Sequence, residues 1–182
     1  MRSVFYWRIL IVSIIALLLA NLILLAAYTY VGKNTYVSIE MSNLEPEAEV
    51  TRQIYEEYKN GNVTEDALLR YIDKQTLASE SAIMIADELG KPLIVRNIGS
   101  TVEMQDFGEY YRAEIQNILR GHTVENSDLK LLNGESAVSV GIPVHDTSGN
   151  VTGCILVIKQ IQRIQSAFNQ LNNVLTGTIL AI

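Results

Sequence analysis

The stretch Glu135–Lys159, ESAVSVGIPVHDTSGNVTGCILVIK, contains two apolar runs around a polar turn that bears a glycine. In the first run every second residue is branched and apolar, namely Val138, Val140, Ile142 and Val144. A period of two is typical of a β-strand. The second run is apolar on both sides, which predicts a central strand covered on both faces. Because residues 146–150 tolerate positive φ or bond their own backbone, the stretch predicts a β-hairpin.

A short pattern lies across this turn: a strand ends in Pro-Val-x-Asp, a glycine follows, and the next strand opens with Val-x-Gly. The matching residues are Pro143, Val144, Asp146, Gly149, Val151 and Gly153. The pattern resembles the last strand pair of the Cache or PAS-like sensor domains that lie outside the membrane in bacterial sensor histidine kinases and chemoreceptors. Among these it is similar to the essential cell-wall sensor kinases of Gram-positive bacteria.

Charge is distributed unevenly along the chain. All 20 Asp and Glu residues lie between Glu40 and Asp146, together with nine of the 14 Lys and Arg residues, so this section carries a net charge of −11. No basic footprint is present, which argues against DNA or RNA as a partner. Cys154 is the single cysteine, which excludes an internal disulfide and a cysteine-cluster metal site. Its apolar strand position favours a buried, unreactive thiol.

Residues 9–31 predict a transmembrane helix. The run 9–27, ILIVSIIALLLANLILLAA, has no charge and only Ser13 and Asn21 as polar interruptions, and with 28–31 it is long enough to span a bilayer. A cleaved signal peptide is the alternative, but the apolar core exceeds the roughly 7 to 15 residues of that class. Arg2 and Arg8 precede the span, which predicts a plasma-membrane protein with residues 1–8 in the cytoplasm.

Residues 32–165 are expected to form one extracytoplasmic domain. A helix over 45–60, capped by Asn43, would bury Val50, Ile54 and Tyr58, and a second helix would begin after Thr64 and bury Leu68, Leu69 and Ile72. An apolar strand 82–87, a turn with Gly90 and a strand 93–96 predict a first hairpin, which also resembles the same sensor family.

A third helix is predicted from Asp106 to Gly121, where Phe107, Tyr111, Ile115 and Ile118 recur at helical spacing. Between it and the last hairpin, only a short strand at 129–132 is indicated. The order of helices and hairpins predicts an α+β fold with an antiparallel PAS/Cache-like sheet, a long N-terminal helix and flanking helices.

Beyond the last strand, apolar residues alternate at spacings of three and four: Ile161, Ile164, Phe168, Leu171 and Leu175. This seam is typical of a two-stranded helical coil, and so of a homodimer joined through the C-terminal helix. An amphipathic helix packed on its own domain would show the same spacing. Residues 174–182 are almost wholly apolar, so 166–182 are expected to contain a connecting helix and the start of a second transmembrane helix.

Catalytic and cofactor motifs are absent from the sequence: it has no G-x-S-x-G, P-loop, H-E-x-x-H or dinucleotide fingerprint. His122 is followed by a threonine, whereas the phosphoacceptor histidine of histidine kinases is followed by an acidic residue. His122, Glu125 and Asp128 are interpreted as solvated side chains rather than as a metal site. We therefore expect no cofactor and no catalytic residue in this chain.

The resemblance implies a ligand against the sheet, beneath the connecting helix and between the two hairpins. Transferred to this sequence, it indicates six ligand-binding residues: Arg96, Tyr110, Tyr111, Arg112, His122 and Ser139. An arginine fork pairs well with a carboxylate or phosphate, so a small anionic or cell-wall-derived ligand is expected. Each residue also has a structural interpretation: Tyr111 fits the core stripe, Arg112 fits a solvated helix surface, and Arg96 ends a strand.

The function that the sequence predicts is signal sensing outside the membrane for a two-component sensor histidine kinase. Membrane lipid, a second copy of the chain and membrane regulatory proteins are the expected partners, and the kinase modules would lie outside this chain. A chemoreceptor or a cyclic-nucleotide enzyme could use the same input region. A non-enzymatic bitopic protein of cell-envelope assembly is the alternative from another class, whereas a pilin would need an acidic residue before Glu40.

Overall fold

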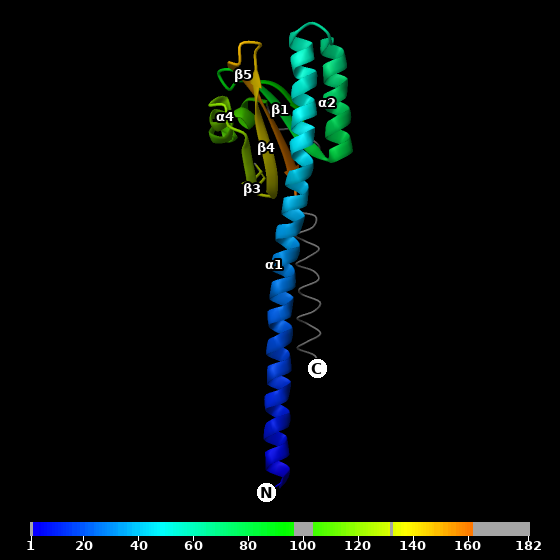
Figure 1. The fold of residues 1–182 in the computed structure, drawn as a ribbon, viewed down its shortest axis with the longest axis vertical. Helices are drawn as coiled ribbons and strands as arrows, with labels where there is room; N and C mark the ends of the chain where they lie inside the picture. The colour runs from blue at the N-terminus through cyan, green and yellow to red at the C-terminus, as the bar shows by residue number, and fades with distance from the viewer. Residues whose placement is uncertain (1, 97–103, 132, 162–182) are drawn as a thin grey trace. The chain divides into compact units, whose positions relative to one another are not determined.

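The computed structural model describes residues 2–96, 104–131 and 133–161 (Figure 1). The chain divides into two compact units, one of them Val37–Gln162 and the other containing Met1–Tyr36. Two helices, two strands, two helices and three strands follow one another, and all five strands form one antiparallel sheet. The predicted α+β class is confirmed.

Helix α1 is continuous over Arg2–Lys59, so the predicted separate helix over 45–60 with an Asn43 cap is wrong. Pro46 lies inside α1; it removes one helical hydrogen bond without ending the helix. The predicted buried side is also wrong, because Val50 is 42% exposed. The buried side carries Leu44, Ala48, Thr51 and Tyr55. Spacings of four, three and four follow the 3.6-residue period, whereas steps of four alone drift around the helix.

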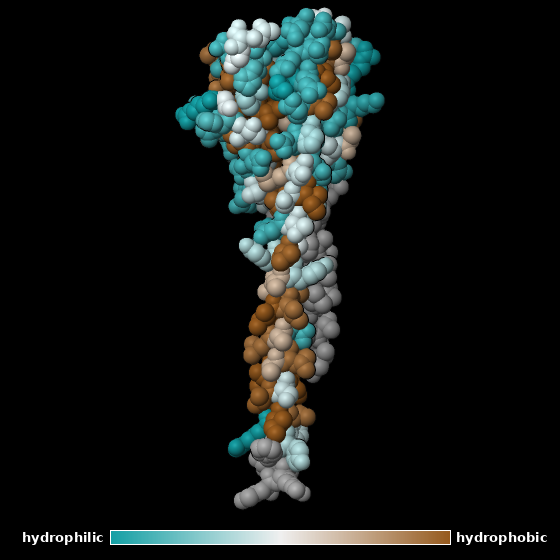
Figure 2. All heavy atoms as spheres, in the orientation of Figure 1, coloured by the Kyte–Doolittle hydropathy of each residue, from teal (hydrophilic) through white to brown (hydrophobic). Residues whose placement is uncertain are grey.

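The N-terminal part of α1 is apolar and exposed. Within the described residues, α1 is the helix whose length and composition would let it cross a membrane, with a mean hydropathy of 3.0 in its most apolar window. Figure 2 shows these hydrophobic side chains gathered along the lower part of α1, while mainly hydrophilic residues cover the visible face of the sheet-containing unit.

Helix α2, Glu65–Ser79, begins as predicted at Thr64, whose side chain accepts a hydrogen bond from the Ala67 N–H. It buries Leu68 and Ile72 together with Thr76, whereas Leu69 is only half-buried. The predicted first hairpin is confirmed as strands β1, Ser81–Asp87, and β2, Pro92–Arg96.

The last hairpin is confirmed as β4, Ser136–His145, and β5, Val151–Gln160. Its turn matches that of the first hairpin: Asp146 Oδ1 accepts from the Ser148 and Asn150 N–H groups, as Asp87 Oδ1 accepts from those of Leu89 and Lys91. The third residue after each aspartate is a glycine with φ of +84° or +80°, a backbone conformation that side chains disfavour. Each aspartate therefore closes its own turn.

The predicted third helix is broken in two, α3 over Met104–Tyr110 and α4 over Arg112–Leu119, with Tyr111 at the junction. Its predicted inner side is nevertheless buried at Phe107, Tyr111, Ile115 and Ile118. The predicted short strand at 129–132 is corrected to β3, Val124–Lys130. Its pairing with β4 is irregular between Asn126 and Leu129, which explains why its sequence lacks a clean period of two.

The strand order is β2-β1-β5-β4-β3, so β5 is central, as predicted. Figure 1 shows α2 and the C-terminal part of α1 on one side of the sheet and α4 on the other. We call these sides the α1/α2 face and the α3/α4 face. The seam residues from Ile164 onward and the segment 166–182 lie outside the described residues.

Candidate functional site

The α3/α4 face of the sheet is covered by a layer centred on Tyr111. The Tyr111 ring lies 4.7 Å from the Phe107 ring and 4.9 Å from the Tyr110 ring, centroid to centroid, the latter pair edge to face. Tyr111 also belongs to the buried cluster that contains Leu129 of β3 and Ala137 of β4. The break between the two helices therefore places an aromatic side chain directly in the core.

Two hydroxyl groups in this layer are buried without a hydrogen-bond partner among the described residues: the Tyr111 Oη and the Ser139 Oγ. Ser139 is wholly buried, and Tyr111 is 1% exposed. Burial also raises the pKa of the Tyr111 hydroxyl above its usual range, with Tyr110 and Glu114 adding to the shift, so the group stays protonated and can donate. Buried hydroxyls normally find a partner, so both groups offer hydrogen-bonding capacity that the described chain leaves unused.

Three contacts show how this helical layer runs along the sheet. The Tyr110 Oη donates to the Leu131 carbonyl at 3.4 Å, and the Asn126 Nδ2 lies 3.5 Å from the Glu114 Oε1. Farther on, Ile118 fills the space above Gly141, where an added Cβ would lie 2.2 Å from the Ile118 Cδ1. Asn126 is opposite Ser139 in the sheet, so the contact between Asn126 and Glu114 places α4 beside the part of the sheet that contains Ser139.

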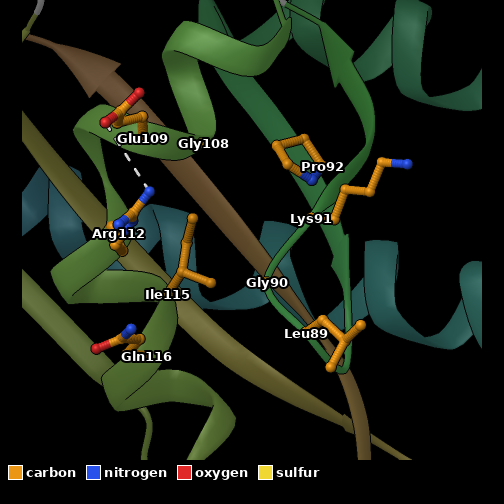
Figure 3. Close-up of a pocket in the computed structure, with 9 residues that line it drawn as sticks. All are labelled: Leu89, Gly90, Lys91, Pro92, Gly108, Glu109, Arg112, Ile115 and Gln116. Carbon is orange, nitrogen blue, oxygen red and sulfur yellow. Dashed lines mark ion pairs between the residues drawn. The ribbon is translucent and has the colours of Figure 1, made fainter.

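A surface hollow of about 350 Å³ lies where the β1–β2 turn meets α3 and α4. Its lining residues are Leu89, Gly90, Lys91, Pro92, Gly108, Glu109, Arg112, Ile115 and Gln116. Gly108 allows the close approach, since a Cβ there would lie 2.4 Å from the Pro92 Cγ. Figure 3 shows Arg112 directed toward Glu109 and the Lys91 amine directed away from both. The Arg112 Nη2 is 3.9 Å from the Glu109 Oε1 and both side chains are largely exposed, so this ion pair is weak.

The structure places four of the six predicted ligand-binding residues on the α3/α4 side of the sheet. Tyr110 and Tyr111 are in ring contact, Ser139 lies on the sheet beneath, and Arg112 lines the hollow on the outer side. Sequence reasoning did not single out Glu109, Gln116 or Lys91, which line the hollow with Arg112. Glu109 and Gln116 lie three residues before and four residues after Arg112, a helical spacing that the sequence does offer. The approach of Lys91 depends instead on how the β1–β2 turn packs against α3 and α4.

Arg96 and His122 lie elsewhere. Arg96 is opposite Ile83 in the sheet, which puts it on the α1/α2 face, and its Nε donates to the Asp73 Oδ1 of α2 at 2.6 Å. His122 is exposed in the segment before β3. In the part of the chain that the structure describes, no three His, Cys, Asp or Glu side chains come together to hold a metal ion.

No protein-family model and no curated protein sequence matches the chain. Solved structures share its fold. The sensor domain of the histidine kinase DctB from V. cholerae is 13% identical with a TM-score of 0.54, over 76% of this chain and 57% of that one. An extracellular ligand-binding receptor from Desulfohalobium retbaense is 12% identical with a TM-score of 0.50, over 72% of this chain and 24% of that one.

The ligand-binding domain of the amino-acid chemoreceptor PctC from Pseudomonas aeruginosa, solved with GABA, is 14% identical with a TM-score of 0.43, over 78% of this chain and 65% of that one. This chain thus spans about a quarter of the D. retbaense receptor structure and just over half of the DctB domain. The fold is therefore PAS/Cache-like, and it is shared with the DctB sensor domain and with the D. retbaense receptor.

Proposed function

We propose that this chain is the membrane-anchored sensing region of a signal-transducing protein, and specifically of a two-component sensor histidine kinase of the cell-wall sensor type. The observation that carries the proposal is that one unbroken helix, Arg2–Lys59, contains both the apolar segment and the buried stripe of a sensor-fold domain. The cell-wall type is supported by the pattern from Pro143 to Gly153, which forms the β4–β5 hairpin.

The proposed topology places residues 1–8 in the cytoplasm and the sheet-containing domain outside the membrane. Arg2 and Arg8 precede the apolar segment and all acidic residues follow it, which is the distribution of a cytoplasmic amino terminus. In the proposed arrangement two copies pair through the C-terminal helix and pass the signal to kinase modules that this chain does not contain.

The proposed ligand site is the α3/α4 layer. Arg112 lines the hollow with only a loose ion pair to Glu109, so its guanidinium could bind a carboxylate or phosphate group without breaking a strong contact. On the inner side, Tyr111 and Ser139 offer hydrogen-bonding capacity that no described residue uses. We expect a small anionic or cell-wall-derived molecule to bind here rather than at Arg96, because the Arg96 guanidinium already pairs with Asp73.

The kinase proposal is tested on the native protein. Native membranes would be incubated with radiolabelled ATP, and antibodies against the described domain would then isolate the protein from them. A kinase is expected to acquire phosphate that is labile in acid and stable in alkali, as phosphohistidine is. Reversible methylation of glutamates without such phosphate would instead identify a chemoreceptor. If the protein carries neither modification, both the kinase proposal and the chemoreceptor alternative are overturned.

A further inference from the structure

The α1/α2 face of the domain contains two carboxylates that the proposed ligand site does not use, Glu40 and Glu47 of α1. The Glu40 Oε2 lies 2.7 Å from the Lys159 Nζ at the end of β5, and the two side chains are only 12% and 22% exposed. Glu47 is 7% exposed. Its Oε1 accepts hydrogen bonds from the Ser81 Oγ at 2.5 Å and the Ser79 Oγ at 2.8 Å.

Both carboxylates meet the same end of the sheet. Ser81 and Lys159 are directly opposite one another in the β1–β5 pairing, and opposite residues project on the same face. Ser81 is the first residue of β1, and Lys159 is the second-last residue of β5. The two polar contacts therefore tie α1 to the sheet at the point where β5 ends and the chain continues toward the C-terminal segment.

The Glu40–Lys159 pair fixes the position of α1 more than it adds stability. Burying an ion pair has a desolvation cost that offsets most of its attraction, so such pairs contribute little net stability but discriminate between arrangements. The neighbouring contacts of Leu44, Ala48 and Tyr55 are apolar, and apolar contacts are not directional. A shift of α1 by one helical turn, about 5.4 Å, would bring Ala48 to the place of Leu44 and keep that contact apolar, but it would separate Glu40 from Lys159.

The helix also has a weak point beside these contacts. Pro46 lies between Glu40 and Glu47 and lacks the N–H of a helical hydrogen bond. At the other end of the domain, the Lys59 Nζ donates to the Thr152 Oγ1 at 2.9 Å, but both groups are exposed. An exposed contact of this kind constrains α1 weakly, so the buried cluster next to Pro46 constrains its position more strongly than the Lys59–Thr152 contact does.

We propose that Glu40, Lys159, Glu47 and Ser81 form a polar latch that holds α1 in one of two positions against the sheet, and that opening the Glu40–Lys159 pair releases α1 to the other. The proposal rests on the proposed function in one respect only: in a sensor, the latch would couple movement of β5 to the helix that contains the apolar segment. Two discrete packings of one helix on one surface are a common basis of switching. The latch is a positioning device and touches no ligand.

The test measures the position of α1 in the full chain, reconstituted in lipid nanodiscs. Spin labels are placed at Gln53→Cys, on the exposed side of α1, and Asp128→Cys, on β3. Cys154 is buried and should remain unlabelled. We expect one distance population in the parent, and a second population displaced by up to about 5 Å in Glu40→Gln and in Lys159→Met, as a shift of one helical turn requires.

The charge-reversed double variant Glu40→Lys with Lys159→Glu should restore the single population, which a merely destabilised fold would not do. Arg52→Gln is the matched control, because it removes ion pairs to Glu49 and Glu56 that lie within α1 itself, and it should leave the distance unchanged. A single unshifted population in both single variants would overturn the latch, as would a double variant that fails to restore the parent distance. Because no kinase output is measured, a failure here is distinct from a failure of the proposed function.

Discussion

Two buried serines lie on opposite faces of the same sheet, and they differ in their hydrogen bonds. Ser81, on the α1/α2 face, is 1% exposed and hydrogen-bonds to the buried carboxylate of Glu47. Ser139, on the α3/α4 face, is wholly buried and has no hydrogen-bond partner among the described residues. A buried serine that is hydrogen-bonded contributes to stability, whereas one without a partner carries the desolvation cost of its hydroxyl.

The two faces also differ in the size of the side chains that line them. The α1/α2 face is lined by branched apolar side chains, among them Ile83, Ile155 and Val140, and is fixed to α1 by an ion pair. On the other face the chain places small residues, such as Ala137 and Gly141, beneath a helical layer that is broken at Tyr111. The first face is therefore the one that holds the sheet to α1, and the second is the one on which the proposed ligand site lies.

The largest effect is expected on the α1/α2 face. Ile155 is fully buried in the central strand, so Ile155→Asp would bury a carboxylate without a partner and should cost more than about 4 kcal/mol, enough to unfold the domain. Circular dichroism of the full chain in detergent would show the loss of strand signal. Thr147→Asp, in the exposed β4–β5 turn, is the control. An Ile155→Asp variant that melts like the parent would show that β5 is not the core strand.

A smaller effect is expected from glycines in the two central strands. Gly141→Ala would bring a Cβ to 2.2 Å from the Ile118 Cδ1, which can rotate away, whereas Gly153→Ala would bring one to 2.5 Å from the fixed Ala86 carbonyl. Overpacking typically costs 1 to 3 kcal/mol, roughly, and we expect Gly153→Ala to lie at the higher end. Thermal melting would rank the two.

Ile118→Val sharpens this prediction. Because it shortens the side chain that meets the new methyl group, it should recover part of the stability lost in Gly141→Ala and none of that lost in Gly153→Ala. Equal recovery in both would mean that Ile118 is not the neighbour of Gly141.

A pH dependence is expected from Cys154, on the α3/α4 face. Burial raises the pKa of its thiol from about 9 to about 12. The unfolded chain therefore ionises above pH 9 while the folded one does not, so stability is complete below pH 9 and falls as pH rises toward 12, by at most about 1.4 kcal/mol per pH unit. Melting temperatures of the parent should decline more steeply over this window than those of Cys154→Ala. Parallel curves would show that the thiol is accessible to water.

The sequence alone was sufficient to predict the strands whose pattern is local. The alternation in β4, the two-sided apolar run of β5 and the aspartate–glycine turns are each encoded within a few residues, and all are confirmed. The buried side of α1 was mistaken because Val50, Ile54 and Tyr58 form a regular series, while the true stripe includes the polar Thr51 and the carboxylates Glu40 and Glu47. A search that admits buried polar residues at spacings of four and three would have found it.

The candidate site was only partly predictable for a related reason. Tyr110, Tyr111 and Arg112 are adjacent in sequence, so their common location needed no tertiary information. The side of the sheet on which Arg96 falls depends on the register of β2, and its partner Asp73 is on another element. A shift of one residue in that register would have placed Arg96 on the opposite face.

The difference between the two faces is tested most directly by paired serine-to-alanine substitutions in the full chain, followed by thermal unfolding in detergent. Ser81→Ala removes a hydrogen bond to a buried carboxylate and should lower stability by about 1.5 to 3 kcal/mol. Ser139→Ala removes a buried hydroxyl that has no described partner, so stability should stay unchanged or rise by up to about 1 kcal/mol. We expect this asymmetry; a loss in Ser139→Ala equal to or greater than that in Ser81→Ala would contradict the difference between the two faces.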